Sequence, residues 1–274
     1  MKVIHRRAFR LNADQDHVRF EVLGLDASQV IRFPDDHSFI VVEIAEDDPR
    51  WPKVLPFLNE QKATDFVTTE FSGSEIESAS FLVMFATAHR GYPQPEKDFA
   101  YLSATYDLTE LCVKCGLGLR QQAPFRLKGE PRSTNKSILQ LNWVFDEFFV
   151  APEVWETLFR PFGVGSREVV FNRTGVRIGS LVQLDITAFC DVSIGGLGRK
   201  DCPVCGRRSY QQANGRYYPA PISTSFPICK SNQLFGAHAN PYRLVIVSHE
   251  VYNAVIRAGL KGVQFCPCEE TPGP

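Results

Sequence analysis

Short runs of apolar and polar positions dominate the N-terminal third of the chain. Their composition and period-two alternation predict strands, because successive side chains of a strand point to opposite faces, over residues 17–23, 38–44 and 65–71. A short helix is expected over residues 51–59, where a proline occupies the first turn. Ser74 and Glu77 match a capping box ahead of the apolar run 76–86, which predicts a second, substantially buried helix.

The middle of the chain continues this mixture of short strands and helices. Its most apolar stretch is residues 138–150, and a short helix is expected over residues 153–159, ended by Pro161 and Gly163. Two further runs, separated by a turn, predict a pair of antiparallel strands over residues 167–171 and 179–185.

The C-terminal segment has the clearest pattern. A strand over residues 242–247 is followed by Ser248, which is placed to cap a helix that runs to about Ala258 and stops at Gly259. Another strand is expected over residues 262–265. Together these patterns predict an α+β fold with mixed and antiparallel sheets and short helices.

A turn-rich stretch, residues 91–95, contains two prolines and suggests a boundary between domains. The sequence therefore predicts an acidic α+β domain over residues 1–100 and a second α+β domain over residues 101–274. Residues 101–111 are expected to form the strand that enters the second domain's first cysteine pair.

Composition excludes several classes of protein. With 274 residues, 44% of them hydrophobic and 22% charged, the chain has the make-up of a globular protein with a sizeable core. Its apolar stretches are too short to cross a membrane. No apolar segment follows the basic residues near the N-terminus, so neither secretion nor a lipid anchor is expected and a cytoplasmic location is predicted.

Charge is distributed unevenly along the chain. Residues 1–111 carry 11 basic and 19 acidic side chains, and the remaining residues carry 19 basic and 12 acidic ones. Many of the basic residues flank the cysteine pairs described below. They could bind phosphate or an acidic protein, they could offset the negative charge of a metal ion ringed by thiolates, or they could pair with the acidic first third of the chain.

Two copies of the pattern Cys-x-x-Cys-Gly are the most specific chemical signal. Zinc prefers four thiolates in a tetrahedron, and a two-residue spacing lets one turn aim both sulfurs at the same ion. The following glycine permits the tight turn, with positive φ, that folds backbone N–H groups over the sulfurs. The sequence thus predicts a structural Zn²⁺ site with the ligands Cys112, Cys115, Cys202 and Cys205. An iron–sulfur cluster, a redox pair and accidental spacing are the alternatives.

The two pairs are separated by an unusually long insert, residues 117–201. A metal ion would therefore hold distant parts of the chain together. Cys190 and Cys229 stand alone in the sequence and are expected to be buried, inert thiols. Cys266 and Cys268 form a weakly specified pair near the C-terminus whose role the pattern leaves open.

No catalytic motif is present. The chain lacks HExxH, the GxSxG elbow, the phosphate loop and a dinucleotide-binding fingerprint, and four thiolates leave no position for a reactive water. Asp146 and Glu147 lie in a stretch of sequence rich in aromatic residues and could form a carboxylate pair in a pocket. Such residues more often lie on the solvent-exposed face of a half-buried helix or strand. A non-enzymatic protein is expected.

The duplicated Cys-x-x-Cys-Gly pattern resembles the double-CxxCG-motif proteins of bacteria, a family associated with immunity to the toxins of polymorphic toxin systems. Residues 247–263 are also similar to the closing helix and strand of such immunity proteins. The resemblance covers the cysteine pairs and this closing segment, while residues 1–100 carry nothing that it assigns. It implies that Cys112, Cys115, Cys202 and Cys205 hold zinc and that the protein is a binder without catalytic residues.

The leading functional hypothesis is a zinc-stabilised protein that binds a protein partner, a cognate toxin, and neutralises it by masking. The acidic N-terminal part would suit a basic toxin that cleaves nucleic acid. The alternatives are a zinc-ribbon protein that binds nucleic acid and a metal-stabilised enzyme of unknown reaction.

Overall fold

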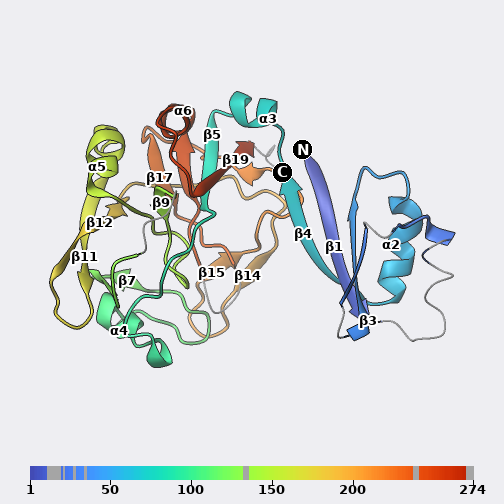
Figure 1. The fold of residues 1–274 in the computed structure, drawn as a ribbon, viewed down its shortest axis with the longest axis horizontal. Coiled ribbons are helices and arrows are strands. Elements are labelled where there is room, and N and C mark those ends of the chain that lie inside the picture. Colours follow the sequence, from blue (N-terminus) through green and yellow to red (C-terminus); the bar gives the residue numbers. More distant parts are fainter. Residues whose placement is uncertain are drawn as a thin grey trace. The chain divides into compact units, whose positions relative to one another are not determined.

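The computed structural model describes residues 1–10, 20, 22–26, 29–33, 36–131, 136–236 and 241–269. The fold combines short helices with antiparallel and mixed sheets, as expected for the α+β class (Figure 1). The chain divides into two compact units. Unit 1 comprises Met1–Glu75 and Ala213–Tyr217, and unit 2 comprises Ile76–Gln212 and Tyr218–Pro274.

Unit 1 contains a four-stranded antiparallel sheet that packs against helix α2 (Trp51–Glu60). The sheet order is β2-β3-β1-β4, formed by β1 (Lys2–Arg10), β2 (Val30–Phe33), β3 (Asp36–Ala45) and β4 (Thr64–Glu70). Helix α2 begins with proline in its first turn and buries one apolar face. That face packs against side chains of β3 in a core that includes Val54, Leu58, Ile40, Val42 and Ile44.

Most expectations for unit 1 are confirmed. The strands predicted over residues 38–44 and 65–71 correspond to β3 and β4, and the predicted helix corresponds to α2. The strand expected over residues 17–23 falls largely outside the described residues, and its described members Phe20, Val22 and Leu23 are helical. The later segment Ala213–Tyr217 belongs to the same unit, where the Gly215 N–H donates to Thr69 Oγ1 at 3.0 Å.

The single helix expected through residue 86 is wrong. A short helix, α3 (Gly73–Ser78), ends early, and the apolar run forms strand β5 (Phe81–Ala86). The capping box also shifts by two residues: the Ser72 N–H donates to Glu75 Oε2 at 2.8 Å, and the Glu75 N–H donates to Ser72 Oγ at 3.3 Å. β5 is a central strand buried on both faces, so its continuous apolar run has no alternation to distinguish it from a buried helix.

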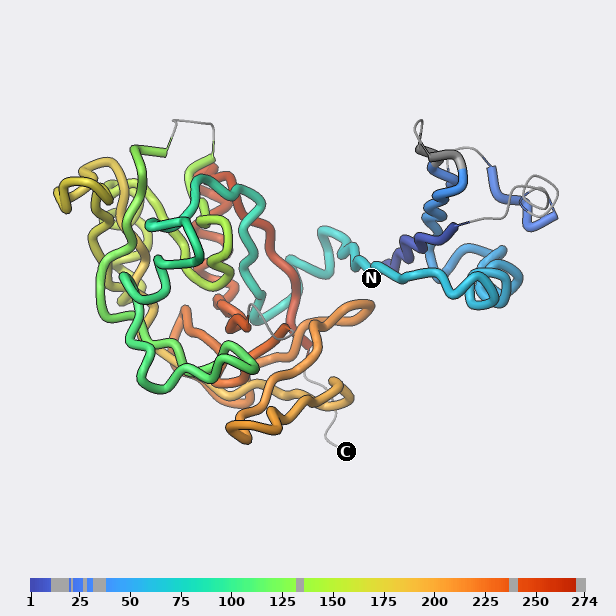
Figure 2. The backbone as a smooth tube through the Cα atoms, turned by 90° about the horizontal axis from the view of Figure 1, so that it is seen from below, coloured from blue at the N-terminus to red at the C-terminus, as the bar shows by residue number. Residues whose placement is uncertain are grey.

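Unit 2 contains a six-stranded sheet built around β5. Its order is β13-β17-β18-β5-β19-β16, from β13 (Phe189–Cys190), β16 (Tyr218–Pro219), β17 (Ile228–Ser231), β18 (Val245–Ser248) and β19 (Val263–Glu269). Both β18 and β19 pair antiparallel with β5, so β5 lies between the two strands of the closing unit. Figure 2 shows the red C-terminal segment running beside the teal strand β5.

The closing unit otherwise matches its prediction. Ser248 caps helix α6 (His249–Arg257), with its side chain accepting from the Val251 N–H, and Gly259 follows the helix with a φ of 63°. Val251 and Val255, both in this helix, are fully buried. The predicted order of strand, helix and strand is therefore confirmed.

A five-stranded sheet completes the main body of unit 2. Its order is β8-β11-β12-β10-β9, from β8 (Phe125–Leu127), β9 (Ile138–Leu139), β10 (Phe149–Val150), β11 (Gly165–Phe171) and β12 (Arg177–Asp185). The antiparallel pairing of β11 with β12 confirms the expected pair of strands. Between β10 and β11 lie α5 (Pro152–Val154), the π-helix η2 (Trp155–Phe159) and the 3-10 helix η3 (Arg160–Phe162). One buried core joins this sheet to the six-stranded one.

The strand expected over residues 101–111 is mostly wrong. Helix α4 (Tyr101–Thr105) follows the 3-10 helix η1 (Lys97–Phe99), and only β6 (Tyr106–Asp107) is extended. The boundary between the units, at Glu75, also differs from the one predicted near residue 100. Residues 81–86 belong to unit 2 because β5 is hydrogen-bonded to β18 and β19. Among the helices of the described residues, none is both long and apolar enough to cross a membrane.

Candidate metal centre

The structure brings all four predicted ligands together. The Sγ atoms of Cys112, Cys115, Cys202 and Cys205 lie within 4.8 Å of one another. Cys112 Sγ is 3.8 Å from Cys202 Sγ, and Cys115 Sγ is 3.6 Å from Cys205 Sγ. A tetrahedron with Zn–S bonds of ~2.3 Å has sulfurs about 3.8 Å apart. The spacing therefore fits a four-coordinate thiolate site.

The two cysteine turns share one backbone geometry. In the first, the Gly116 N–H donates to Cys112 O at 2.7 Å and the Cys112 N–H donates to Leu117 O at 2.9 Å. In the second, the Gly206 N–H donates to Cys202 O and the Cys202 N–H donates to Arg207 O, both at 2.9 Å. Gly116 and Gly206 have φ values of 72° and 70°, which glycine adopts without steric cost. The role predicted for these glycines is confirmed.

Each turn lies at the tip of a short antiparallel pair of strands. The first lies between β6 and β7 (Arg120–Gln121), with Tyr106 opposite Gln121. The second lies between β14 (Arg199–Asp201) and β15 (Arg208–Tyr210). The insert, residues 117–201, forms β7 to β14 and returns at the four sulfurs. Two hairpin-like tips thus face one another, as a zinc ribbon requires.

Arg207 joins the two tips by contacts that do not involve the metal. Its guanidinium donates to the backbone carbonyls of Glu110 and Leu117 and forms an ion pair with the Glu110 carboxylate at 2.6 Å. Gly118 makes this approach possible, because a Cβ at that position would lie 1.9 Å from Glu110 O. Sequence reasoning missed this role, since a lone arginine beside a cysteine pair carries no signal of its contacts.

Backbone donors prepare the first sulfur of each turn to bind a cation. The N–H groups of Cys205 and Val204 lower the pKa of Cys202 to about 6. In the first turn the Cys115 N–H lowers the pKa of Cys112. Burial raises the pKa of Cys115, so that thiol releases its proton only when a cation compensates the charge. Metal binding is therefore coupled to the loss of protons.

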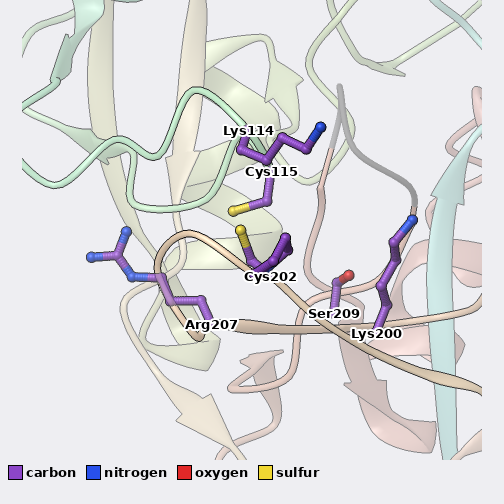
Figure 3. Close-up of a pocket in the computed structure, with 7 residues that line it drawn as sticks. Lys114, Cys115, Lys200, Cys202, Arg207 and Ser209 are labelled. Carbon is purple, nitrogen blue, oxygen red and sulfur yellow. The ribbon is translucent and has the colours of Figure 1, made fainter.

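Basic side chains surround the sulfurs. Lys114, Lys200 and Arg207 line a shallow pocket with Cys115, Cys202, Pro203 and Ser209. Figure 3 shows the sulfurs of Cys115 and Cys202 pointing toward each other, with Arg207 and Lys200 on opposite sides. Carboxylates offset part of the positive charge near the sulfurs, because Glu110 pairs with Arg207 at 2.6 Å and Asp201 pairs with the neighbouring Arg199 at 2.9 Å and Arg208 at 3.2 Å.

The remaining cysteines lie elsewhere. Cys190 and Cys229 are buried as expected, but they are not isolated, since their Sγ atoms are 3.0 Å apart. Cys266 and Cys268 both lie on β19. Among the described residues, the group that could hold a metal ion contains neither Cys266 nor Cys268.

The carboxylates Asp146 and Glu147 make separate internal contacts. Glu147 forms an ion pair with Lys230 and accepts from Gln183 Nε2 at 3.0 Å. Burial raises the pKa of Glu147, which Lys230 partly offsets. Asp146 instead accepts from the Arg243 N–H at 3.1 Å. These contacts tie strands of unit 2 together, and they favour a structural role for both residues over a catalytic one.

Four thiolates fill every position of a tetrahedral ion, so this arrangement is typical of a structural metal site. No protein-family model matches the chain, and a search of curated proteins finds no similar sequence. The resemblance to the double-CxxCG-motif proteins therefore stays a prediction based on the cysteine turns and the closing segment.

Proposed function

We propose that this chain is a non-enzymatic binding protein that is stabilised by Zn²⁺ and recognises a protein partner. The observation that carries the proposal is the closed set of four sulfurs, all within 4.8 Å of one another. A site of this kind has no position for substrate or a reactive water, so its contribution is to fix the fold. We infer that the protein functions through the surface around the two cysteine turns, which the metal would hold rigid.

The tips of the two cysteine turns present apolar side chains to solvent. Val113 is 93% exposed and Val204 is 70% exposed, each inside its Cys-x-x-Cys sequence. Large apolar side chains on rigid loops are typical of contact surfaces, because a binding surface ordered in advance loses little entropy when a partner docks. Lys114, between Val113 and Cys115, adds a positive charge to this surface.

The partner that we propose is a toxin, which the protein would neutralise by covering its active surface. Two observations support this choice. The cysteine turns and the closing strand and helix resemble those of immunity proteins, and residues 1–111 carry 19 acidic against 11 basic side chains. An acidic surface would accelerate association with a basic, nucleic-acid-cleaving toxin through electrostatic steering.

Co-purification from the native cell extract tests the proposal. The wild-type chain should retain a protein partner, and the variant Val113→Asp/Val204→Asp should lose it while keeping its zinc. Val176→Asp is the matched control, because Val176 is also exposed, at 60%, but lies in the turn between β11 and β12. Absence of any partner with the wild-type chain, or equal retention by both aspartate variants, would contradict the proposal.

Nucleic-acid binding is the second candidate, and the basic lining of the pocket beside the sulfurs favours it. Within that lining Arg207 is paired with Glu110, and four thiolates around a divalent ion would offset further positive charge. Binding to phosphate would weaken steeply with added salt. Fluorescence anisotropy with labelled DNA and RNA at low salt separates the candidates, and a salt-sensitive complex would support this second one.

A further inference from the structure

Two cysteines outside the metal centre lie against each other in the six-stranded sheet. Cys190 lies on β13 and Cys229 on β17, which are hydrogen-bonded neighbours. Their Sγ atoms are 3.0 Å apart, and the residues are 4% and 1% exposed. A disulfide has a sulfur–sulfur bond of ~2.05 Å, so an approach of about 1 Å would allow the bond to form.

We propose that Cys190 and Cys229 are a redox modification site, at which a peroxide forms a reversible disulfide between β13 and β17. The position of β13 at the edge of the sheet would let an oxidant reach the two sulfurs when this strand opens. β13 has only two residues and lies at the edge of its sheet, and Phe189 beside Cys190 is 46% exposed. Short edge elements open locally at a small fraction of the global unfolding free energy.

The contact between the sulfurs assigns a role to each cysteine. The hydrogen bond between the two sulfurs lowers the pKa of Cys229 and raises the pKa of Cys190. Cys229 therefore deprotonates first and is the attacking nucleophile. Cys190 retains its proton and is the resolving thiol.

The reaction balances with hydrogen peroxide as the oxidant. The Cys229 thiolate attacks one peroxide oxygen, the O–O bond breaks, and the released hydroxide takes up a proton to form water. The Cys229 sulfenic acid has then lost two electrons. Cys190 sulfur attacks Cys229 sulfur, the S–O bond breaks, and hydroxide leaves with the Cys190 proton as a second water.

The other cysteines of this sheet are less reactive. Burial raises the pKa of Cys266 to about 11 and also raises the pKa of Cys268, so both remain protonated near neutral pH. A disulfide between Cys190 and Cys229 is therefore the expected product within the sheet. Disulfides in reducing compartments are usually transient and sense redox conditions.

The disulfide would also support the metal centre. The segment between Cys190 and Cys229 contains the second cysteine turn and the strands β14 and β15. Closing this loop of about 40 residues restricts the unfolded chain and should raise the Tm by about 5–15 °C. Zinc should consequently be released more slowly from the oxidised protein, because the second turn opens less often.

Peptide mapping of the zinc-loaded, full-length protein tests the proposal. After treatment with hydrogen peroxide, free thiols are alkylated and the protein is digested with trypsin without reduction. Cys190 falls in the tryptic peptide 178–199 and Cys229 in the peptide 217–230, and each peptide contains one cysteine. The expected product is these two peptides joined, with the mass of two hydrogens lost, and separated again by dithiothreitol.

Three comparisons make the result decisive. Cys229→Ser should abolish the joined peptide and the rise in Tm, whereas Cys268→Ser should leave both intact. The peroxide concentration is raised until the four cysteines of the metal centre oxidise. Their oxidation shows that the protein has received enough oxidant. Recovery of Cys190 and Cys229 as separately alkylated peptides at that point, or their joining to other cysteines, would overturn the proposal.

Discussion

Replacing Cys202 by serine is the most direct perturbation of the metal centre. Cys202 Sγ lies 3.8 Å from Cys112 Sγ, across the junction of the two cysteine turns. Serine keeps the size of the side chain and the backbone turn, but its hydroxyl is a poor zinc ligand at neutral pH. The change therefore measures what the Cys202 sulfur contributes to zinc binding and to stability.

The expected loss can be worked out from the chain path. A metal ion shared by Cys115 and Cys202 closes a loop of roughly 90 residues, and chain entropy alone makes such a cross-link worth about 4–5 kcal/mol. For a unit of this size, 1 kcal/mol shifts the Tm by about 2–4 °C. The variant should consequently unfold about 10–20 °C below the wild type and retain far less zinc.

Two measurements check this expectation, namely zinc content per chain by elemental analysis and Tm by circular dichroism. Cys190→Ser, under reducing conditions, is the control, because Cys190 is buried but lies outside the metal-binding group. One zinc per chain is expected for the wild type and for the control. If Cys202→Ser retains one zinc and unfolds with the wild type, or if both variants behave alike, the ligand assignment is wrong.

Three further predictions concern the scaffold. Glu147→Gln should destabilise unit 2 by about 3–5 kcal/mol in denaturant unfolding, because it leaves Lys230 buried without its counter-charge, and Glu147→Gln/Lys230→Met should recover most of the loss. An equal loss in the double variant would refute this explanation. Gly118→Ala should cost at least about 1–3 kcal/mol, since φ is 108° and the new Cβ would overlap Glu110 O, whereas Gly129→Ala meets no atom within 4 Å and should be nearly neutral. The Arg50 side chain lowers the pKa of Asp48 from 3.8 to about 2, so this carboxylate stabilises unit 1 fully above pH 3.8 and the contribution is lost as pH falls through about 2. Asp48→Asn should remove that part of the acid-unfolding profile, and an unchanged profile would contradict the assignment.

Capping, proline placement and turn patterns predicted the helices and strands whose boundaries depend only on neighbouring residues. Helix α2 has a proline in its first turn, and α6 begins after a serine cap, as their sequences predict. The strands β11 and β12 are close in sequence and pair through a short turn. The cluster of four cysteines was also predictable, because ligand type, spacing and the glycine after each pair all express local geometry.

Other features depend on packing between distant segments. β5 could not be separated from a helix, because a strand buried on both faces loses its alternation. Its place between β18 and β19 moves the boundary between the units to Glu75. The contact of Cys190 with Cys229 has a similar origin, since parallel pairing of β13 and β17 depends on the whole sheet.

The sequence by itself therefore determined the class of fold, the helices α2 and α6, the strand pair β11 and β12, and the identity of the four cysteines that come together. Each of these depends on interactions within a few residues, where backbone sterics and capping decide the outcome. Only the tertiary structure decided the strand order, the bridge from Arg207 to Glu110 and the second cysteine pair. These features arise from long-range contacts, whose partners no local pattern in one sequence can identify.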